Sequence, residues 1–148
     1  MSGFRDMGAI PERIEWRGAA VMAFDATGRA LMQLRDDIPQ IAAPGKWSFF
    51  GGAVDPGEAL DTAARREFLE ETGIDIAQDE ISPVARFASV FRNNGVIHVY
   101  RLHRTVAPHE PRLGEGAGFA FLTRRQVESF ALIEGFREIL LGLDHLAP

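Results

Sequence analysis

The sequence predicts an α/β fold in which helices cover both faces of a central mixed β-sheet, an α/β/α sandwich. Segments with strand character come first, one helix follows them, and further strands and then helices complete the chain. The earliest strand segment, 18–25, is apolar on both sides and therefore needs cover on both faces of its sheet. The length of 148 residues suits a single domain, 1–148, which can bury about two thirds of its unfolded surface without disulfides.

Apolar patterning and turn residues define the elements in the first third of the chain. Residues 1–16 are mixed in character and contain a proline, so we expect a lead-in arm there. The buried strand over 18–25 ends in an Asp-Ala-Thr-Gly turn, and a second strand is expected over 29–35. Two prolines and a glycine predict a loop over 36–46, which leads into a short strand over 47–50.

One uninterrupted helix is expected over 58–72. Alanine and leucine recur along this segment, and it contains neither glycine nor proline. The pair Pro56 and Gly57 sets a turn before the helix, and Gly73 supplies the left-handed residue that commonly follows a helix end.

The remaining chain predicts a hairpin and two further helices. Segments 84–91 and 96–103 are rich in β-branched and aromatic residues, and the Asn-Asn-Gly sequence at 93–95 is a hairpin turn signal. The other expected elements are, in chain order, a loop over 107–116, a strand over 118–122, a helix over 124–130 with Thr123 as its N-cap, and an amphipathic helix over 134–143.

Three glutamates of the helix expected over 58–72 form a cluster that could bind a metal ion. Glu67, Glu70 and Glu71 stand at i, i+3 and i+4, which places their carboxylates on one helical face. If that face is partly buried, two carboxylates about 5 Å apart repel by about 3 kcal/mol, and a divalent cation removes this repulsion. Oxygen ligands favour Mg²⁺, or Mn²⁺ as a substitute, over softer metals. The alternative is a solvated face, on which like-charge pairs cost roughly a few tenths of a kcal/mol.

Composition excludes several classes of protein. The net charge of −5 offers no global field for polyanions, so we expect no nucleic-acid partner. The absence of cysteine excludes a disulfide framework and a thiolate nucleophile. The N-terminus has no apolar run like that of a signal peptide, and no stretch reaches the length of a membrane span. We therefore expect no membrane partner and a cytoplasmic location.

The segment from Gly52 to Ile74 carries the most specific pattern in the chain. It reads Gly-x5-Glu-x7-Arg-Glu-apolar-x-Glu-Glu-x-Gly-apolar, with its fixed residues at Gly52, Glu58, Arg66, Glu67, Glu70, Glu71 and Gly73. This pattern resembles, without a departure, the signature of the Nudix hydrolases. The resemblance implies the family's α/β/α sandwich around a mixed sheet, and the expected order of elements matches it over most of the chain.

The resemblance also implies a reaction and a set of roles. Nudix hydrolases cleave a diphosphate linkage in a nucleoside diphosphate joined to a moiety X, and they depend on divalent metal ions. By resemblance, the metal ligands here would be the backbone carbonyl of Gly52 and the carboxylates of Glu67, Glu70 and Glu71. Arg66 and Glu58 resemble the family's internal ion pair, which orients the metal-binding glutamates. An ordinary surface salt bridge is the alternative for that pair.

The general base that activates the attacking water has two candidates. One is Glu71, within the helix. The other is Glu115, on the loop before the strand over 118–122, where many Nudix enzymes place an additional glutamate. Glu110 on the same loop is a weaker choice, and a loop glutamate is more often a solvated surface residue.

The sequence limits the substrate only weakly. It lacks the residues that mark the family's ADP-ribose, dinucleoside polyphosphate and coenzyme A subgroups, which favours a (d)NTP or a related small nucleotide. Aromatic residues that could stack on a base are more often part of the core, and arginines that could pair with phosphate more often face water. We therefore assign no role to these candidates: Trp47, Phe49, Phe91, Tyr100, Arg35, Arg92, Arg101 and Arg104.

Two alternatives come from other functional classes. A catalytically silent Nudix domain that senses a nucleotide or sugar-nucleotide often lacks glutamates of the signature, and isomerases on this fold typically recruit a cysteine. This chain retains every residue of the signature and has no cysteine, which favours hydrolysis. Members of the family commonly form homodimers, and the sequence itself identifies no exposed apolar stripe for such an interface.

Overall fold

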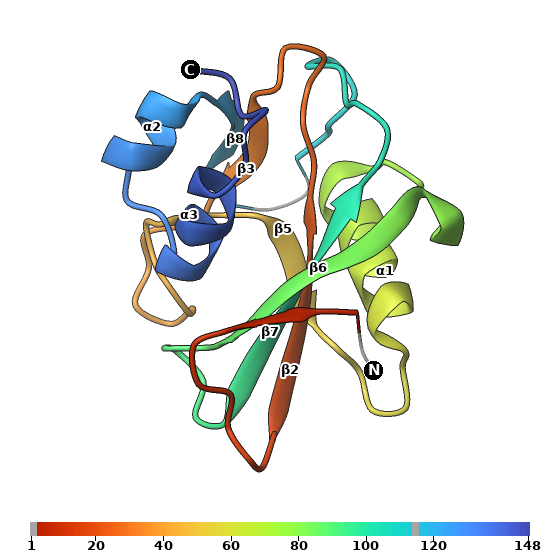
Figure 1. Cartoon of the computed structure of the whole chain (residues 1–148), viewed down its shortest axis with the longest axis vertical. Coiled ribbons are helices and arrows are strands. Elements are labelled where there is room, and N and C mark those ends of the chain that lie inside the picture. Colours follow the sequence, from red (N-terminus) through yellow and green to blue (C-terminus); the bar gives the residue numbers. More distant parts are fainter. Residues whose placement is uncertain (1–2, 114–115) are drawn as a thin grey trace.

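The protein, in a computed structural model that describes residues 3–113 and 116–148, contains two β-sheets (Figure 1). The larger sheet is mixed and has the strand order β1-β6-β7-β2-β5. Its strands are β1 (Arg5–Met7), β2 (Trp16–Met22), β5 (Phe50–Ala53), β6 (Ile81–Ala88) and β7 (Gly95–Leu102). The smaller sheet is antiparallel and has the order β4-β3-β8, formed by β3 (Ala30–Leu34), β4 (Trp47–Ser48) and β8 (Gly118–Leu122).

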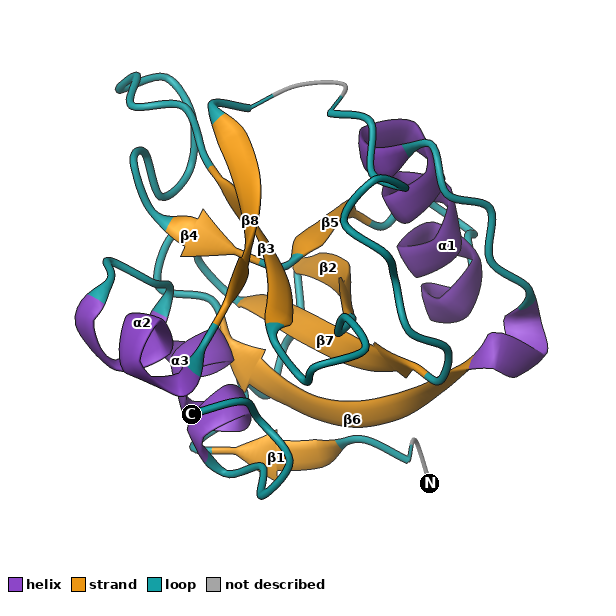
Figure 2. Cartoon of the chain, turned by 90° about the horizontal axis from the view of Figure 1, so that it is seen from above, coloured by secondary structure: helices purple, strands orange, loops and turns teal. Residues whose placement is uncertain are grey.

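Helices lie on the two sides of the larger sheet (Figures 1 and 2). α1 (Leu60–Thr72) covers one face, whereas α2 (Arg124–Ser129) and α3 (Glu134–Leu141) lie on the other side together with the smaller sheet. A 3₁₀ turn, η1 (Gln78–Glu80), precedes β6. The arrangement confirms the predicted α/β/α sandwich around a mixed sheet. Within the described parts of the chain, no helix combines the length and the hydropathy needed to cross a bilayer.

Strand β2 contributes to two apolar cores, because alternate residues of a strand point to opposite faces of its sheet. Ala20 and Met22 belong to the core that includes α3 and the smaller sheet, whereas Ala19 and Val21 belong to the core beneath α1. All four side chains are almost fully buried. The apolar character of both sides of the segment therefore corresponds to a strand that is covered on both faces.

The same strand places the glycine turn. β5 pairs with β2 in the antiparallel direction, with Gly52 opposite Ala19 and Gly51 opposite Ala20. On its other side β2 pairs in parallel with β7. β5 is thus the edge strand of the larger sheet, and α1, which follows it in the chain, packs against both β5 and β2.

The lead-in arm expected over 1–16 contains a strand that the sequence did not indicate. β1 pairs in parallel with β6 at the far edge of the larger sheet. Phe4 packs edge-on against the rings of His98 and Tyr100, with ring centroids 5.1 Å apart in both cases. These contacts join residues that are distant in the sequence, so local patterns could not predict them.

The strand expected over 47–50 is divided at Phe49. The Phe49 ring packs in one core against Phe136, with centroids 4.5 Å apart. The Phe50 ring packs in the other core, 6.2 Å from Phe68. Consecutive aromatic side chains thus enter opposite cores, and the chain passes between them from the smaller sheet to the larger one.

The remaining elements agree with the prediction to within a few residues. The helix expected over 58–72 begins at Leu60, and its C-cap Gly73 has the left-handed φ of 76°. β6 and β7 form the expected antiparallel hairpin, whose turn includes Asn94 with a φ of 53°. Thr123 caps α2 as expected, because its side chain accepts a hydrogen bond from the Gln126 N–H.

His98 is a buried base whose ionisation opposes folding. It is 3% exposed, and its Nδ1 lies 3.2 Å from the Gly18 carbonyl oxygen. Burial lowers the pKa of His98 below the usual 6.5, and the positive charges of Arg86 and Arg17 lower it further. Below pH 6.5 the unfolded chain therefore binds more protons than the folded one. The stability that neutral His98 contributes is present above this pH and is lost as the pH falls.

We expect the wild-type protein to lose stability relative to His98→Asn as the pH falls from about 7 to about 5. The difference in free energy of unfolding should change by at most about 1.4 kcal/mol per pH unit, the limit for one proton. Urea unfolding at several pH values measures it, and the exposed His109→Asn variant is the control. A difference between wild type and His98→Asn that stays constant with pH would contradict the prediction.

Candidate functional site

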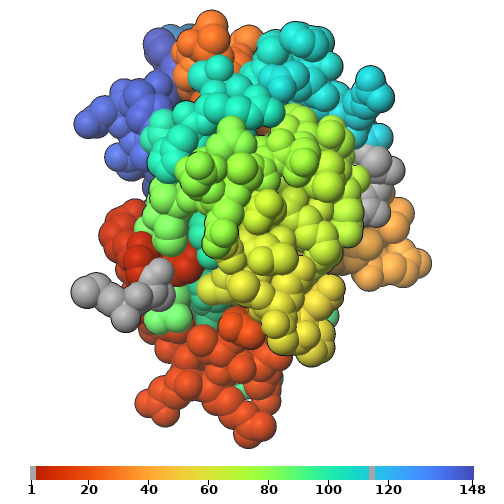
Figure 3. All heavy atoms as spheres, turned by 90° about the vertical axis from the view of Figure 1, so that its right-hand side faces the viewer, coloured from red at the N-terminus to blue at the C-terminus, as the bar shows by residue number. Residues whose placement is uncertain are grey.

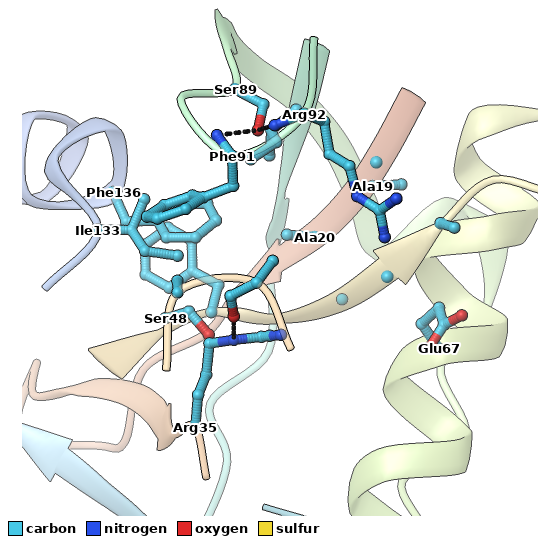
Figure 4. A pocket seen from close by; sticks show the side chains of 18 of the residues that line it. Ala19, Ala20, Arg35, Ser48, Glu67, Ser89, Phe91, Arg92, Ile133 and Phe136 are labelled. Carbon is cyan, nitrogen blue, oxygen red and sulfur yellow. Dashed lines mark hydrogen bonds between the residues drawn. The ribbon is translucent and has the colours of Figure 1, made fainter. Parts of the chain in front are cut away.

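A cavity of about 280 Å³ lies between β5, α1, the start of α3 and the hairpin tip, residues 89–94 between β6 and β7 (Figure 4). One end of the cavity is polar and is lined by Gly51, Gly52, Glu67 and Glu71. The other end is apolar, and Figure 4 shows Phe91, Ile133 and Phe136 gathered there, away from Glu67 on α1. The expected glycine turn and two of the expected metal ligands therefore share a cavity with aromatic side chains.

The three glutamates of α1 have three different surroundings. The helix is anchored in its core by Phe68, which is fully buried, and its outer side forms part of the surface shown in yellow to green in Figure 3. Glu71 is 6% exposed, whereas the side chains of Glu67 and Glu70 are 17% and 57% exposed. The structure therefore does not show a uniformly solvated face. Glu67 and Glu71 line the cavity and Glu70 is largely open to water.

Arg66 is the centre of an ion-pair network. Its guanidinium donates two hydrogen bonds to the Glu58 carboxylate, at 2.7 and 2.9 Å, so the expected ion pair is present. It also donates to Glu67 at 2.9 Å, to Glu70 at 3.4 Å and to the Ala53 carbonyl at 3.1 Å. These bonds connect the turn before α1, strand β5 and two glutamates of α1.

The network keeps its central pair ionised. The hydrogen bonds from Arg66, followed by the one from the Asp55 N–H, lower the pKa of Glu58 to about 2. The same pairing with Glu58, and then with Glu67, raises the pKa of Arg66 above its usual range. The pair is therefore fully charged throughout the neutral pH range, and its geometry does not depend on pH there.

Gly51 and Gly52 are required for two different steric reasons. A β-carbon on Gly51 would collide with the backbone of β2 at Ala19 and Ala20. A β-carbon on Gly52 would lie 2.5 Å from the carboxyl carbon of Glu67. Gly51 thus permits β5 to pair with β2, and Gly52 permits the Glu67 carboxylate to approach the β5 backbone.

The donor atoms at the polar end suit a hard divalent cation, because carboxylate and carbonyl oxygens are the ligands that Mg²⁺ and Mn²⁺ prefer. Among residues 3–113 and 116–148, no three side chains of His, Cys, Asp or Glu converge as a preformed metal cage. Glu67 and Glu70 instead accept hydrogen bonds from the Arg66 guanidinium. Metal binding would require both carboxylates to exchange part of this bonding for the ion.

Gln33 belongs to the site and was not predicted. It is 3% exposed on β3, and its Nε2 donates to Oε2 of Glu71 and to the carbonyl of Phe49, both at 3.4 Å. One signal could have found it: the strand reads Ala-Leu-Met-Gln-Leu, and a buried amide in an apolar strand needs hydrogen-bond partners.

The aromatic and arginine candidates divide into two groups. Those that line the cavity are Phe49, Phe91, Arg35 and Arg92. The others have partners elsewhere: Trp47 packs on Phe130, Tyr100 packs on Phe4, Arg101 contacts His145, and Arg104 bonds Glu110.

The candidates for the general base also separate. Glu71 lines the cavity, whereas Glu115 lies outside the residues that the structure describes. The weaker choice, Glu110, accepts hydrogen bonds from the Ala107 N–H at 2.6 Å and from Arg104 at 3.1 Å, and these lower its pKa. Glu110 does not line this cavity and instead has the bonding of a structural cap.

The hairpin tip holds its side chains in defined positions beside the cavity. The Ser89 hydroxyl accepts hydrogen bonds from the N–H groups of Phe91 and Arg92, both at 3.1 Å (Figure 4). The Arg92 guanidinium stacks over Trp16, 5.3 Å from the ring centroid. Phe91 is 39% exposed and still belongs to the cavity wall.

Comparison with known proteins finds matches over most of the chain. The family model described as "NUDIX domain" matches residues 15–140. The crystal structure of a MutT protein from Methanosarcina mazei Go1 has a TM-score of 0.71 and covers 89% of this chain and 94% of that one, at 23% sequence identity. At this identity the likeness concerns the fold.

Two curated relatives match shorter segments. A Bacillus subtilis protein, provisionally named as an 8-oxo-dGTP diphosphatase, is 41% identical over 61 residues, which are 41% of this chain and 37% of that protein. The nucleoside triphosphatase NudI of Escherichia coli is 48% identical over 40 residues, which are 27% of this chain and 28% of that protein. The chain thus spans less than two thirds of each relative's length.

We expect Gly51→Ala and Gly52→Ala to fail in different ways. Gly51→Ala should lower the melting temperature by about 3–10 °C, because overpacking against the β2 backbone costs about 1–3 kcal/mol. Gly52→Ala should leave the melting temperature nearly unchanged but displace Glu67 and weaken Mn²⁺ binding by about tenfold or more. Thermal unfolding and titration with Mn²⁺ followed by electron paramagnetic resonance measure the two effects.

The matched control for both variants is Gly118→Ala, whose added β-carbon meets open space. It should change neither quantity. If Gly52→Ala lowered the melting temperature as much as Gly51→Ala and left Mn²⁺ binding intact, the two steric assignments would be wrong.

Proposed function

The chain belongs to the Nudix domain family, and we propose that it is a nucleotide pyrophosphohydrolase that depends on a divalent metal ion, Mg²⁺ or Mn²⁺. Its reaction would be the hydrolysis of a diphosphate linkage in a nucleoside diphosphate joined to a moiety X. The observation that carries the proposal is the two-ended cavity, with signature carboxylates at one end and apolar side chains at the other. A nucleotide has two matching parts, a polyanion and a flat base.

At the polar end, bound metal would offset the charge of the phosphate oxygens and make a coordinated water more acidic. The ligands that we propose for it are the backbone carbonyl of Gly52 and the carboxylates of Glu67, Glu70 and Glu71. Arg66 and Glu58 would act by orienting these carboxylates. Their mutual bonds of 2.7 and 2.9 Å, and the bond from Arg66 to Glu67, support this role.

At the other end, the cavity offers one apolar compartment, formed by Phe91, Ile133 and Phe136, and the Phe49 ring packs against Phe136. A single compartment suits one base, which supports a (d)NTP or a related small nucleotide rather than a dinucleoside polyphosphate. Arg35 and Arg92 line the same cavity and would supply positive charge for phosphate groups, although the Arg35 Nε also donates to the Ala42 carbonyl at 2.7 Å. The name of the Escherichia coli relative, a nucleoside triphosphatase, agrees with this substrate class.

Ser48 is the candidate that we propose for contact with the edge of the base. The residue lines the cavity, and its hydroxyl is buried without a hydrogen-bond partner among the described residues. Rotation about the Cα–Cβ bond would offer the base a donor or an acceptor. Phe91 would stack on the face of the base.

Two residues are still candidates for the general base. Glu71 is supported by its place in the cavity wall at the polar end. Glu115 stays a prediction, since it lies outside the described residues.

A catalytically silent domain that senses a nucleotide or sugar-nucleotide is the alternative function. The same cavity would bind such a ligand. The complete set of signature carboxylates favours hydrolysis, because binding alone does not require Glu67, Glu70 and Glu71 together.

We also propose a cytoplasmic setting and a small-molecule substrate rather than a nucleic acid. The net charge of −5 supports a small-molecule substrate, since it repels long polyanions such as nucleic acids.

A homodimer stays a prediction, and light scattering during gel filtration would check it.

Turnover of a nucleotide panel tests the proposed activity. With Mg²⁺, the purified protein should convert at least one dNTP or NTP to the nucleoside monophosphate and pyrophosphate; NDP-sugars, ADP-ribose and dinucleoside polyphosphates complete the panel. Glu70→Gln should lower kcat by about 100-fold or more, as expected when a metal ligand is lost. The exposed Glu128→Gln on α2 is the matched control. Tight binding of one compound without turnover would support the sensor instead.

We expect Phe91→Ala to lower kcat/KM for the preferred nucleotide by about 5- to 150-fold, because base stacking on an aromatic ring contributes about 1–3 kcal/mol. Hydrolysis of ribose 5-triphosphate, which has no base, should change little. Steady-state kinetics measures both, with Val90→Ala as the control, since Val90 is 84% exposed on the same hairpin tip. Equal losses on both substrates would show that Phe91 does not contact the base.

A further inference from the structure

Gln33 connects the smaller sheet to the polar end of the cavity. Its strand β3 is central in that sheet, with Gln33 opposite Ser48 of β4 and opposite Phe119 of β8. The backbone of Gln33 is therefore held on both sides. From this position the side chain reaches across to α1 and to the segment that leads into β5, where its amide nitrogen donates to Glu71 and to the Phe49 carbonyl.

The two acceptors of the amide belong to the two segments that carry the proposed metal ligands. Glu71 lies on α1, and the Phe49 carbonyl lies immediately before β5, the strand that contains Gly52. One amide thus links the carboxylate of the helix to the backbone that enters the glycine turn. It does so from β3, a strand that supplies none of the proposed ligands.

A neutral donor is the suitable group at this position. Glu71 is 6% exposed, and a carboxylate buried to this extent needs hydrogen bonds to offset its lost hydration. A lysine or arginine at position 33 would bring a positive charge that competes with a cation for the carboxylate, and a glutamate would repel it. The amide donates without adding charge, so the carboxylate keeps its full attraction for a metal ion.

We propose that Gln33 is a positioning residue: by holding Oε2 of Glu71 and the Phe49 carbonyl together, it sets the orientation of the Glu71 carboxylate relative to the Gly52 backbone. The role rests on the proposed function, because Glu71 is a ligand only if the polar end takes a divalent cation. Gln33 acts through Glu71 and is not among the residues that line the cavity of about 280 Å³.

A double-mutant cycle on Mn²⁺ affinity tests this role without turnover. Gln33→Leu should weaken Mn²⁺ binding by about 10- to 100-fold in the wild-type background, the range found for residues that orient ligands. In the Glu71→Ala background the same substitution should change Mn²⁺ affinity by less than about twofold, because the side chain that it positions is gone. In the active protein, Gln33→Leu should lower kcat more than it changes KM for the nucleotide.

Gln33→Met serves as a second variant of similar length if Gln33→Leu does not fold, and both should behave alike. Met32→Leu is the matched control, since Met32 is the neighbouring residue of β3 and its side chain packs in the core on the other side. Melting temperatures of all variants separate loss of fold from loss of Mn²⁺ affinity.

Each outcome distinguishes the role of Gln33 from the proposed activity. Unchanged Mn²⁺ affinity in Gln33→Leu, or equal losses in both backgrounds, would overturn the positioning role even if the wild type hydrolyses nucleotides. Coupling between Gln33 and Glu71 in Mn²⁺ binding, with no nucleotide hydrolysed by the wild type, would uphold the positioning role and overturn the activity.

Discussion

The geometry of the polar end depends on one guanidinium group. Arg66 contacts carboxylates from the turn before α1 and from α1 itself: Asp55, Glu58, Glu67 and Glu70. Without this cation, four negative charges would share a small volume and repel one another. Glu58 takes two of its bonds and fixes the plane of the guanidinium, so the remaining nitrogen bonds have defined directions. The single positive charge of Arg66 does not neutralise the four carboxylates around it. The excess negative charge that remains attracts a divalent cation.

The cavity joins parts of the chain that are far apart in the sequence. Its polar end comes from the continuous segment of β5 and α1, whereas its apolar end comes from the hairpin tip and the start of α3. The two ends meet because β2 lies between β5 and β7 in the larger sheet and supplies apolar side chains to both of its faces. Between the two ends, β5 can lie close to β2 and to the Glu67 carboxylate only because Gly51 and Gly52 have no side chains.

Sequence patterns predicted the features that are encoded locally. Gly73 ends α1, Thr123 begins α2, and the spacing of the signature brings Arg66 to Glu58. Contacts over long sequence separations were beyond such patterns. They include β1 beside β6, the division of the strands into two sheets, and the bond from Gln33 to Glu71 across 38 residues. The apolar wall was equally out of reach, because an exposed aromatic such as Phe91 and a core residue such as Phe136 look alike in a sequence.

The separate origin of the two cavity ends has a consequence for how relatives of this chain diverge. Substitutions, insertions or changes of length in the hairpin tip and at the start of α3 alter the apolar wall that we propose for the base, yet they leave the bonds of Arg66 untouched. Evolution can therefore retune the choice of compound while the hydrolytic end is conserved. Two chains with identical signatures need not consume the same metabolite, and libraries aimed at new selectivity belong in these two segments.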